Sequence, residues 1–244
     1  MHVLGLDIGG TGIKGALVET GTGVLITERF RLRTPEKAEP GPVMETIRKV
    51  VEHFAWNGSV GCGFPAVIKH GVAYTAANIS DRWIGFDVRQ ALVDATGCPA
   101  TVINDADAAG IAEMRFGAGM GEAGTVLVLT LGTGIGTALF VRGQLVPNME
   151  LGHIEVNGRE AEPWTADIAR KRERLSWKKW GRRLNIYLQA LERLVSPDLI
   201  IIGGGASREH EKFFPCLDLE TRVVPAAMLN EAGIIGAALA ATGL

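Results

Sequence analysis

Short apolar runs that end at glycine clusters alternate along this chain with segments of helical periodicity. The apolar run at residues 3–8 predicts a buried strand, and after the GGTG turn Ile13, Gly15 and Leu17 continue at strand periodicity. Residues 24–32 predict a third strand. The first glycine cluster therefore joins strand to strand, whereas the glycine loop of a Rossmann or Walker nucleotide site opens a helix.

Apolar positions at residues 43–54 recur at helical spacing, and residues 60–64 and 99–103 predict two further short strands. The second of these ends at Asn104-Asp105, and residues 106–116 predict a helix directly after it. The pattern so far is that of a mixed α/β protein.

The second half of the chain repeats the arrangement of the first. The run TVLVLTL at residues 125–131 predicts a strand, GTGIG follows, and residues 137–141 predict a returning strand. A basic amphipathic helix at residues 177–194, a strand at 199–202 and a small-residue helix from Glu231 complete the predicted elements. This weak internal repeat predicts two similar lobes, each offering a glycine loop to one ligand.

Composition and charge exclude several classes of protein. Hydrophobic residues make up 47% of the 244 residues and charged residues 21%, a globular balance. A formal net charge of −2 argues against a nucleic-acid-binding protein. Because no apolar run approaches the ~20 residues that span a bilayer, we expect no membrane association and a cytoplasmic location. The three cysteines, an odd number without metal-ligand spacing, are typical of a reducing compartment.

The two glycine loops are candidate phosphate sites, because backbone N–H groups without a nearby Cβ can converge on phosphate oxygens. In the first loop we expect Gly9, Gly10 and Thr11 to contact phosphate and Lys14 to add a positive charge. Asp7 is placed to hold Mg²⁺, directly or through water. The second loop offers Gly132, Thr133 and Gly134. The alternative is that each loop is only a hairpin turn.

The pair Asn104-Asp105 marks the point where a strand gives way to a helix. Asn and Asp both favour the N-cap position, so a purely structural role is one interpretation. Phosphoryl transfer to a hydroxyl also needs a carboxylate that accepts the proton. Asp105, next to phosphate loops, fits that role as general base.

Acidic residues and a histidine gather after the second hairpin. Glu150 and His153 lie in ELGHIE, and Glu162 follows shortly after. Carboxylates accept hydrogen bonds from vicinal sugar hydroxyls, and histidine can donate or accept, so the cluster suits sugar recognition. A zinc site and a structural His–Glu surface pair are the alternatives.

In this order, the motifs resemble the ROK sugar kinases, a branch of the actin-like ATPase superfamily. The resemblance covers nearly the whole chain. It rests on DIGGT at Asp7 with Lys14, Gly61-x-Gly63-x-Pro65, Asn78, Asn104-Asp105, LGTGIG at residues 131–136, ELGH at 150–153, Gly203-Gly204-Gly205 and NEAGIIG at 230–236.

The resemblance implies an α/β fold of the actin-like ATPase (ribonuclease H-like) type, with two lobes and a central cleft. We place the small lobe at residues 1–103 plus 230–244 and the large lobe at 104–229. By the family pattern Asp105 is the general base on the sugar 6-hydroxyl. The other sugar hydroxyls would be held by Asn78, Asn104, Glu150, His153 and Glu162.

Many ROK proteins carry a CxCGxxGC zinc motif after the GH step, and here that segment reads HIEVNGREAEPW. We therefore expect no structural zinc, and the position of Glu162 lacks its usual landmark. The first phosphate loop lies only a few residues from Met1, so we expect an enzyme and not a helix-turn-helix repressor of this family.

Within the family, GFPA at Gly63, LSWKKW at Leu175, RLNIYLQALERL at Arg183 and SPDLIIIGGGAS at Ser196 resemble the polyphosphate glucokinases. That branch phosphorylates glucose from inorganic polyphosphate, often also from ATP, and in some cases accepts mannose. A homodimer is implied by the resemblance alone.

Basic residues concentrate between positions 170 and 193 and suit a polyanionic donor, which can be held only through its charges. The candidates are Arg170, Lys171, Lys178 and Arg182, with Gly203, Gly204 and Gly205 as the nucleotide region. A solvated helix face is the structural alternative. The rival functions are an ATP-only glucokinase or other ROK hexose kinase, and a non-catalytic sugar-sensing protein of the same fold.

Overall fold

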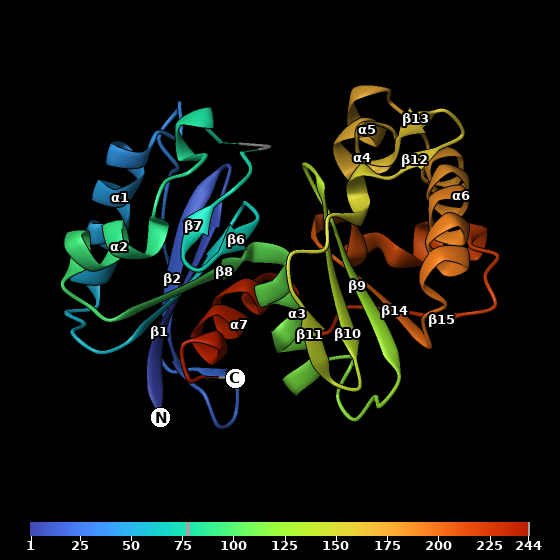
Figure 1. Ribbon diagram of the computed structural model, residues 1–244. Helices are drawn as coiled ribbons and strands as arrows, with labels where there is room; N and C mark the ends of the chain where they lie inside the picture. Colours follow the sequence, from blue (N-terminus) through green and yellow to red (C-terminus); the bar gives the residue numbers. More distant parts are fainter. Residues whose placement is uncertain (77–78, 244) are drawn as a thin grey trace. The chain divides into compact units, whose positions relative to one another are not determined.

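The computed structural model describes residues 1–76 and 79–243 (Figure 1). The chain forms two compact units: unit 1 comprises Met1–Ala112 and Glu231–Leu244, and unit 2 comprises Glu113–Asn230. The division falls within helix α3 (Asp105–Phe116). The lobes predicted from sequence divide the chain earlier, between residues 103 and 104, and assign Asp105 to the other part.

Unit 1 is built on a sheet of strand order β3-β2-β1-β5-β8, with β4 also pairing with β2. Strand β1 (His2–Gly9) and β2 (Gly12–Glu19) form an antiparallel hairpin, as the first glycine cluster predicts. Strands β5 (Val60–Phe64) and β8 (Ala100–Asn104) extend the sheet in parallel to β1. Parallel strands place their carboxyl ends at one edge, where the candidate residues Asp7 and Asn104 lie.

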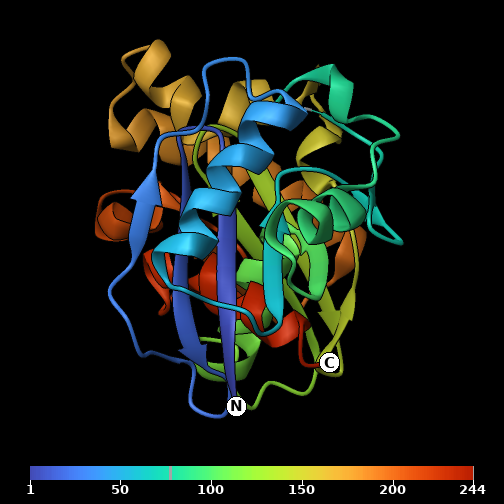
Figure 2. The same cartoon turned by 90° about the vertical axis from the view of Figure 1, so that its left-hand side faces the viewer.

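Helices cover the two faces of this sheet (Figure 2). Helix α1 (Pro40–His53) and α2 (Val88–Thr96) pack together on one face, and α7 (Ala232–Ala240) packs on β1 and β5. A Cβ at Gly5 would lie 2.1 Å from the carbonyl oxygen of Ile234, and one at Gly61 would lie 1.8 Å from that of Ala237. Glycine at these two positions is what lets α7 approach the sheet so closely.

One predicted strand of unit 1 is wrong in its extent. Residues 24–32 form two short strands, β3 (Val24–Leu25) and β4 (Phe30–Leu32). Between them the Leu17 N–H donates to the Thr27 hydroxyl at 3.0 Å, where a continuous ladder would use a backbone carbonyl. Because the Thr27 hydroxyl takes the place of a backbone carbonyl in the pairing with β2, the regular strand is interrupted here.

Unit 2 repeats the sheet plan with strand order β11-β10-β9-β14-β15. Strand β9 (Thr125–Leu131) and β10 (Ile135–Val141) form the second hairpin, β11 (Gln144–Val146) follows β10, and β14 (Leu199–Gly203) and β15 (Arg222–Pro225) run parallel to β9. The hairpin setting of the second loop is confirmed.

Helix α6 (Trp177–Val195) carries the apolar face that covers this second sheet. The Ser176 hydroxyl caps its N-terminus by accepting from the Lys179 N–H at 3.3 Å. Trp180 is fully buried and donates to the Thr165 carbonyl at 2.8 Å, so it packs in the core of unit 2. Trp177 stacks on Phe213 with 5.9 Å between ring centroids.

The remaining elements are short. Strands β6 (Ile68–Lys69) and β7 (Val72–Ala73) pair in unit 1, and β12 (Glu155–Val156) and β13 (Arg159–Glu160) pair in unit 2, where α4 (Ala161–Thr165) and α5 (Asp167–Arg172) follow. Short 3₁₀ turns lie at Asp81–Trp83, Leu151–His153, Gly205–Lys212, Phe214–Cys216 and Leu229–Glu231.

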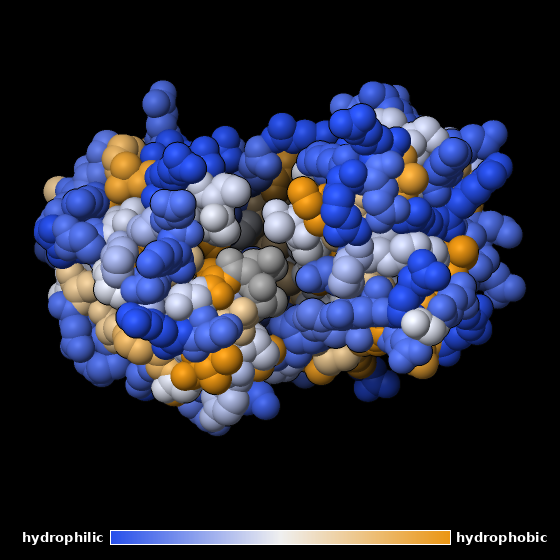
Figure 3. All heavy atoms as spheres, turned by 90° about the horizontal axis from the view of Figure 1, so that it is seen from above, coloured by the Kyte–Doolittle hydropathy of each residue, from blue (hydrophilic) through white to orange (hydrophobic). Residues whose placement is uncertain are grey.

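Hydrophilic residues cover most of the surface visible in Figure 3, and hydrophobic residues lie in scattered patches. Over residues 1–76 and 79–243, no helix has the length and apolar character needed to cross a bilayer.

Candidate active site

In unit 1 the first glycine loop carries a carboxylate and a cation side by side. Asp7 lies near the end of β1 opposite Lys14 of β2, and the Lys14 ammonium donates to Asp7 Oδ2 at 2.8 Å. A Cβ at Gly233, in α7, would lie 3.0 Å from Asp7 Cγ, so the start of α7 also borders this carboxylate. Lys14, predicted to add charge for phosphate, is held at the loop by Asp7.

Two residues that sequence analysis missed fix the shape of this loop. The buried Thr34 hydroxyl donates to the Gly9 carbonyl at 2.6 Å. The exposed Arg31 of β4 donates to the Thr11 carbonyl at 2.9 Å. Its guanidinium lies close against the turn, since a Cβ at Gly12 would stand 2.3 Å from Arg31 Nε. In the sequence, arginines alternate with the apolar Phe30 and Leu32, a pattern typical of a strand with one polar face, and this was the available signal for Arg31.

Asn104 and Asp105 lie at the end of β8 and the start of α3. The Asn104 side-chain oxygen accepts from the Ala106 and Asp107 N–H groups at 2.8 and 3.0 Å, so Asn104 caps α3 and the structural alternative holds for this residue. Its amide donates to the Ala66 carbonyl at 3.1 Å. Asp105 therefore begins α3 half-buried, where the helix dipole favours a negative charge.

Gly63 of β5 permits this placement of Asp105. A Cβ at Gly63 would lie 3.5 Å from Asp105 Cα and 3.3 Å from Ala108 Cβ. Asp7 pairs in register with Gly63 of β5, and Gly63 pairs with Ile103 of β8, so Asp7 and Asp105 lie at the ends of the two strands that flank β5. Unit 1 thus gathers a loop with cations and two carboxylates at a single sheet edge.

In unit 2 the second glycine loop is held by a carboxylate. The Ile135 N–H donates to Glu162 Oε2 at 2.7 Å, and a Cβ at Gly134 would stand 2.6 Å from the same oxygen. The Ile168 N–H donates to the Gly132 carbonyl at 3.1 Å, which ties the start of α5 to the loop. Glu162 therefore borders the loop itself, besides lying with the predicted sugar cluster.

The predicted sugar cluster does assemble. His153 Nε2 lies 3.8 Å from Glu150 Oε2, and its Nδ1 is hydrogen-bonded to Glu160, a residue the sequence analysis did not select. That hydrogen bond raises the pKa of His153; burial opposes it, and the charges of Glu162, Glu160 and Glu150 add to it. Burial raises the pKa of Glu150, His153 opposes the shift and Glu162 adds to it.

Backbone contacts set the position of this cluster. The Thr137 hydroxyl donates to the Met149 carbonyl and accepts from the Leu151 N–H at 3.1 Å. The buried Tyr187 hydroxyl of α6 donates to the Leu151 carbonyl at 3.2 Å. These contacts fix the chain on both sides of Glu150, so β10 and α6 together hold the cluster.

The glycine run at the end of β14 adjoins the second loop. Gly203 pairs in register with Thr130, and Gly204 has φ +77° with its Cβ position 2.5 Å from the Leu131 backbone. Only glycine fits such an approach without strain. Gly203 and Gly204 therefore lie beside the second glycine loop.

The four predicted basic residues differ in their partners. The buried Asp167 carboxylate accepts from Arg170 Nε at 2.8 Å and pairs with Lys171 Nζ at 2.6 Å. The Arg170 guanidinium also lies 3.7 Å from the Trp177 ring centroid. Lys178 and Arg182 are exposed one turn apart on α6 and form no ion pair with any residue of the described ranges.

Asn78, predicted to bind the sugar, lies outside the described residues.

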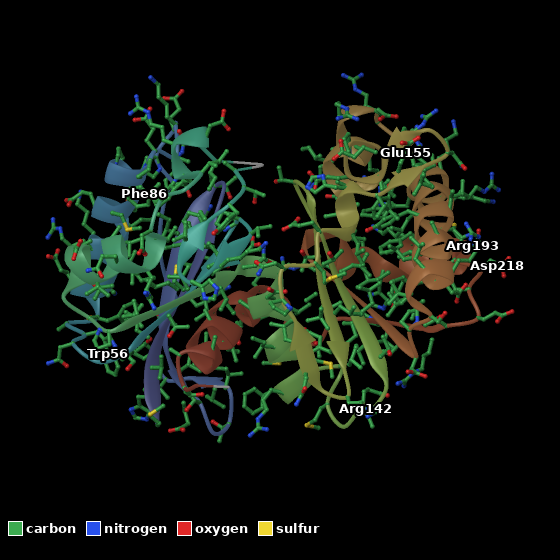
Figure 4. All side chains as sticks on the ribbon, in the orientation of Figure 1. Trp56, Phe86, Arg142, Glu155, Arg193 and Asp218 are labelled. Atoms are coloured by element: carbon green, nitrogen blue, oxygen red, sulfur yellow. The ribbon has the colours of Figure 1, made fainter. Side chains whose placement is uncertain are left out.

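Glu155, labelled in Figure 4, is exposed on β12 and is not the hydrogen-bond partner of His153. An open surface depression of about 290 Å³ next to Glu160 is lined by Arg159, Glu160, Pro163, Trp164, Arg172 and Glu173.

The chain is similar to known proteins over most of its length. The sequence profile of the ROK family matches residues 3–167. A polyphosphate glucokinase from Mycobacterium tuberculosis is 47% identical over 240 residues, which cover 98% of this chain and 91% of that protein. The corresponding Mycobacterium leprae enzyme is 44% identical over 98% of this chain and 74% of its own length.

Among solved structures, an inorganic polyphosphate/ATP-glucomannokinase from Arthrobacter sp. strain KM superposes with a TM-score of 0.96 at 47% identity, covering 99% of this chain and 98% of that one. A ROK family glucokinase from Streptomyces griseus, solved with glucose and AMPPNP, gives a TM-score of 0.85 at 24% identity over the whole of both chains. The second match bears on the fold alone.

Proposed function

Because the chain belongs to the ROK family, whose sugar kinases have the actin-like ATPase fold, we propose that it is a hexose kinase acting on glucose. The phosphoryl donor is inorganic polyphosphate. ATP as a second donor and mannose as a second acceptor are further substrates to be tested. The main support for this proposal is the 47% sequence identity to a polyphosphate glucokinase over nearly the whole chain.

Asp105 acts as the general base. Its carboxylate takes the proton of the sugar 6-hydroxyl while the oxygen of that hydroxyl bonds to the transferred phosphorus and the bond from phosphorus to the donor breaks. Support comes from its place at the start of α3, where the helix dipole stabilises the ionised carboxylate. Glu150, His153 and Glu162 bind the other sugar hydroxyls, and Asn104 assists while capping α3.

The glycine loops bind the donor. In unit 1, Gly9, Gly10 and Thr11 offer backbone N–H groups and a hydroxyl, with Lys14 and Arg31 beside them. In unit 2, Gly132, Thr133 and Gly134 do the same next to Gly203, Gly204 and Gly205. Preorganised donors of this kind stabilise the negative charge of the transferring group.

Asp7 is suited to a Mg²⁺ ion that the donor brings. Mg²⁺ in kinase sites is bound through one or two carboxylates together with substrate phosphates, and Asp7 is a partly exposed carboxylate at the phosphate loop. When bound, the ion neutralises the donor phosphates. Lys14 takes up one oxygen of Asp7, so the other oxygen or a bridging water serves the ion.

For a polyphosphate chain we favour Lys178 and Arg182 over Arg170 and Lys171. The first pair is exposed on α6, whereas the second pair is already bound to Asp167. Binding through lysine and arginine alone is strongly weakened by salt. We also propose that the enzyme is a homodimer, which size measurement in solution tests.

A coupled assay of glucose 6-phosphate formation, with polyphosphate or ATP as the sole donor and at several salt concentrations, tests the proposal. We expect turnover with polyphosphate and a donor KM that rises with salt. Turnover with ATP alone identifies an ATP-dependent hexose kinase, and none with either donor identifies a non-catalytic sugar-binding protein.

A further inference from the structure

We propose that Glu160 is a positioning residue for sugar recognition: it fixes the ring and the protonated nitrogen of His153, so that Nε2 is presented to the acceptor sugar. The inference rests on the proposed function, because it assumes that His153 binds the sugar. It assigns a role to a residue that neither glycine loop nor sugar motif contains.

A short hairpin carries Glu160 to this place. Strands β12 and β13 pair with Glu155 opposite Glu160 and Val156 opposite Arg159. The two residues between them, Asn157 and Gly158, have φ of +53° and +74°. Positive φ at both central residues, with the sequence Asn-Gly, is the signature of a type I′ turn, which fixes strand register.

The hairpin is tied to the histidine segment at its base. The Ala161 N–H donates to the Ile154 carbonyl at 3.0 Å, directly beside the residues in question. Backbone contacts therefore hold Glu160 next to the residues that directly follow His153, within reach of Nδ1, to which it is hydrogen-bonded.

The chemistry of the pair decides the tautomer. An ionised carboxylate only accepts hydrogen bonds, so the hydrogen bond to Glu160 places a proton on Nδ1 of His153. Nε2 then faces Glu150, 3.8 Å away. In the neutral ring Nε2 accepts from a sugar hydroxyl, and in the imidazolium it donates.

Other charged groups around the ring act in the same direction. Glu150 precedes the His153 turn and Glu162 lies on α4, and both favour the imidazolium. Tyr187, the titratable residue that α6 brings to this segment, donates to the Leu151 carbonyl. Glu160 makes the largest contribution to the raised pKa of His153.

The solvent exposure of the His153–Glu160 pair shows whether the pair contributes to folding stability. The side chains of His153 and Glu160 are 44% and 47% exposed, so solvent screens their attraction and it adds little to folding. Replacing Glu160 should therefore leave the fold intact and act on sugar binding.

The test compares Glu160→Gln with Glu155→Gln. Glutamine keeps the size of the side chain but removes its charge, and its amide can meet Nδ1 either as donor or as acceptor, so the tautomer is no longer fixed. Glu155 is the cross-strand neighbour of Glu160 and does not contact His153, so its replacement removes the same charge from the same hairpin.

We expect Glu160→Gln to raise the glucose KM about tenfold at pH 8, because Nε2 of His153 is then no longer fixed as the acceptor for the sugar hydroxyl, while the donor KM stays unchanged. The increase in glucose KM caused by Glu160→Gln should become smaller towards pH 6. Below the ordinary histidine pKa of about 6.5, both ring nitrogens are protonated without help from Glu160. Glu155→Gln should behave as the wild type.

Imidazole ¹⁵N shifts of His153 give a readout independent of activity: Glu160→Gln should lower its pKa and abolish the fixed Nδ1–H tautomer. An unchanged glucose KM at pH 8, or equal effects of both substitutions, overturns the proposal. Failure of the proposed function is recognised separately, since the wild type itself would then lack glucose-dependent turnover.

Discussion

The sheets of unit 1 and unit 2 share one strand arrangement but carry different residues at their strand ends. Each places a glycine-containing hairpin beside two parallel strands, in the orders β2-β1-β5-β8 and β10-β9-β14-β15. In unit 1 the fourth strand ends in Asn104 and leads to Asp105, whereas β15 of unit 2 ends at Pro225 and continues with Ala226. In the proposed function both copies of this architecture bind phosphate, and unit 1 supplies the base, Asp105.

The charges at the two hairpins also differ. Lys14 and Arg31 lie at the first loop, while a carboxylate, Glu162, holds the second. Cations at a loop serve the negative donor. A carboxylate that binds the loop and also borders the sugar cluster can link the two substrates. We therefore predict that the first loop serves the donor alone and the second loop serves both substrates.

Removing the base gives the largest expected effect. Asp105→Asn keeps the shape of the α3 start but cannot accept the proton, so kcat should fall about 10³-fold with glucose binding preserved. Steady-state assay and calorimetric titration with glucose measure the two quantities. A variant with near-normal kcat would remove Asp105 from the mechanism.

Overpacking the first sheet is the next largest effect. Gly61→Val drives a side chain into the Ala237 backbone of α7, and we expect a loss of about 3 kcal/mol in unfolding free energy. Denaturant titration measures it. The control is Gly41→Ala in α1, where no atom lies within 4 Å of the new Cβ; it should be neutral or stabilising. A neutral Gly61→Val would contradict the close approach of α7.

Removing the carboxylate at the second loop tests its double role. Glu162→Ala leaves the Ile135 N–H without its partner and removes a charged hydrogen-bond acceptor from the proposed sugar site, and we expect kcat/KM to fall ~30-fold. We expect weaker use of both glucose and donor, measured by varying each in turn. An effect on glucose alone would confine Glu162 to the sugar cluster.

Removing a cation at the first loop should act on the donor alone. Arg31→Ala loses the contact with the Thr11 carbonyl and one positive charge, and the donor KM should rise about tenfold at unchanged glucose KM. The control is Arg142→Ala, an exposed arginine in the turn that follows β10, labelled in Figure 4. Equal effects of both substitutions would indicate a general loss of charge.

Much of the fold was predictable, because apolar runs and glycine clusters mark strands and turns directly. Both hairpins, α1, α3, α6 and α7 follow from such patterns. Helix α2 was missed although Asp87 caps it by accepting from the Gln90 N–H, and Gly97 ends it with φ +70°. The break between β3 and β4 depends on the Thr27 hydroxyl, a long-range contact that the local pattern does not contain.

The candidate site was predictable where a motif carries it and not where contacts between distant segments do. Glu150, His153 and Glu162 assemble as their motif indicates. Glu160 and Arg31 were missed because their roles depend on hairpin register and on how a guanidinium lies over Gly12. The pairing of Arg170 and Lys171 with Asp167 likewise follows from burial of that carboxylate.

The most direct test is the initial rate of glucose 6-phosphate formation from glucose with inorganic polyphosphate as the sole donor, for the wild type and Asp105→Asn side by side. The account predicts polyphosphate-dependent turnover in the wild type and about 10³-fold less in the variant. Equal rates for the two proteins, or a wild type that turns over only with ATP, would contradict it.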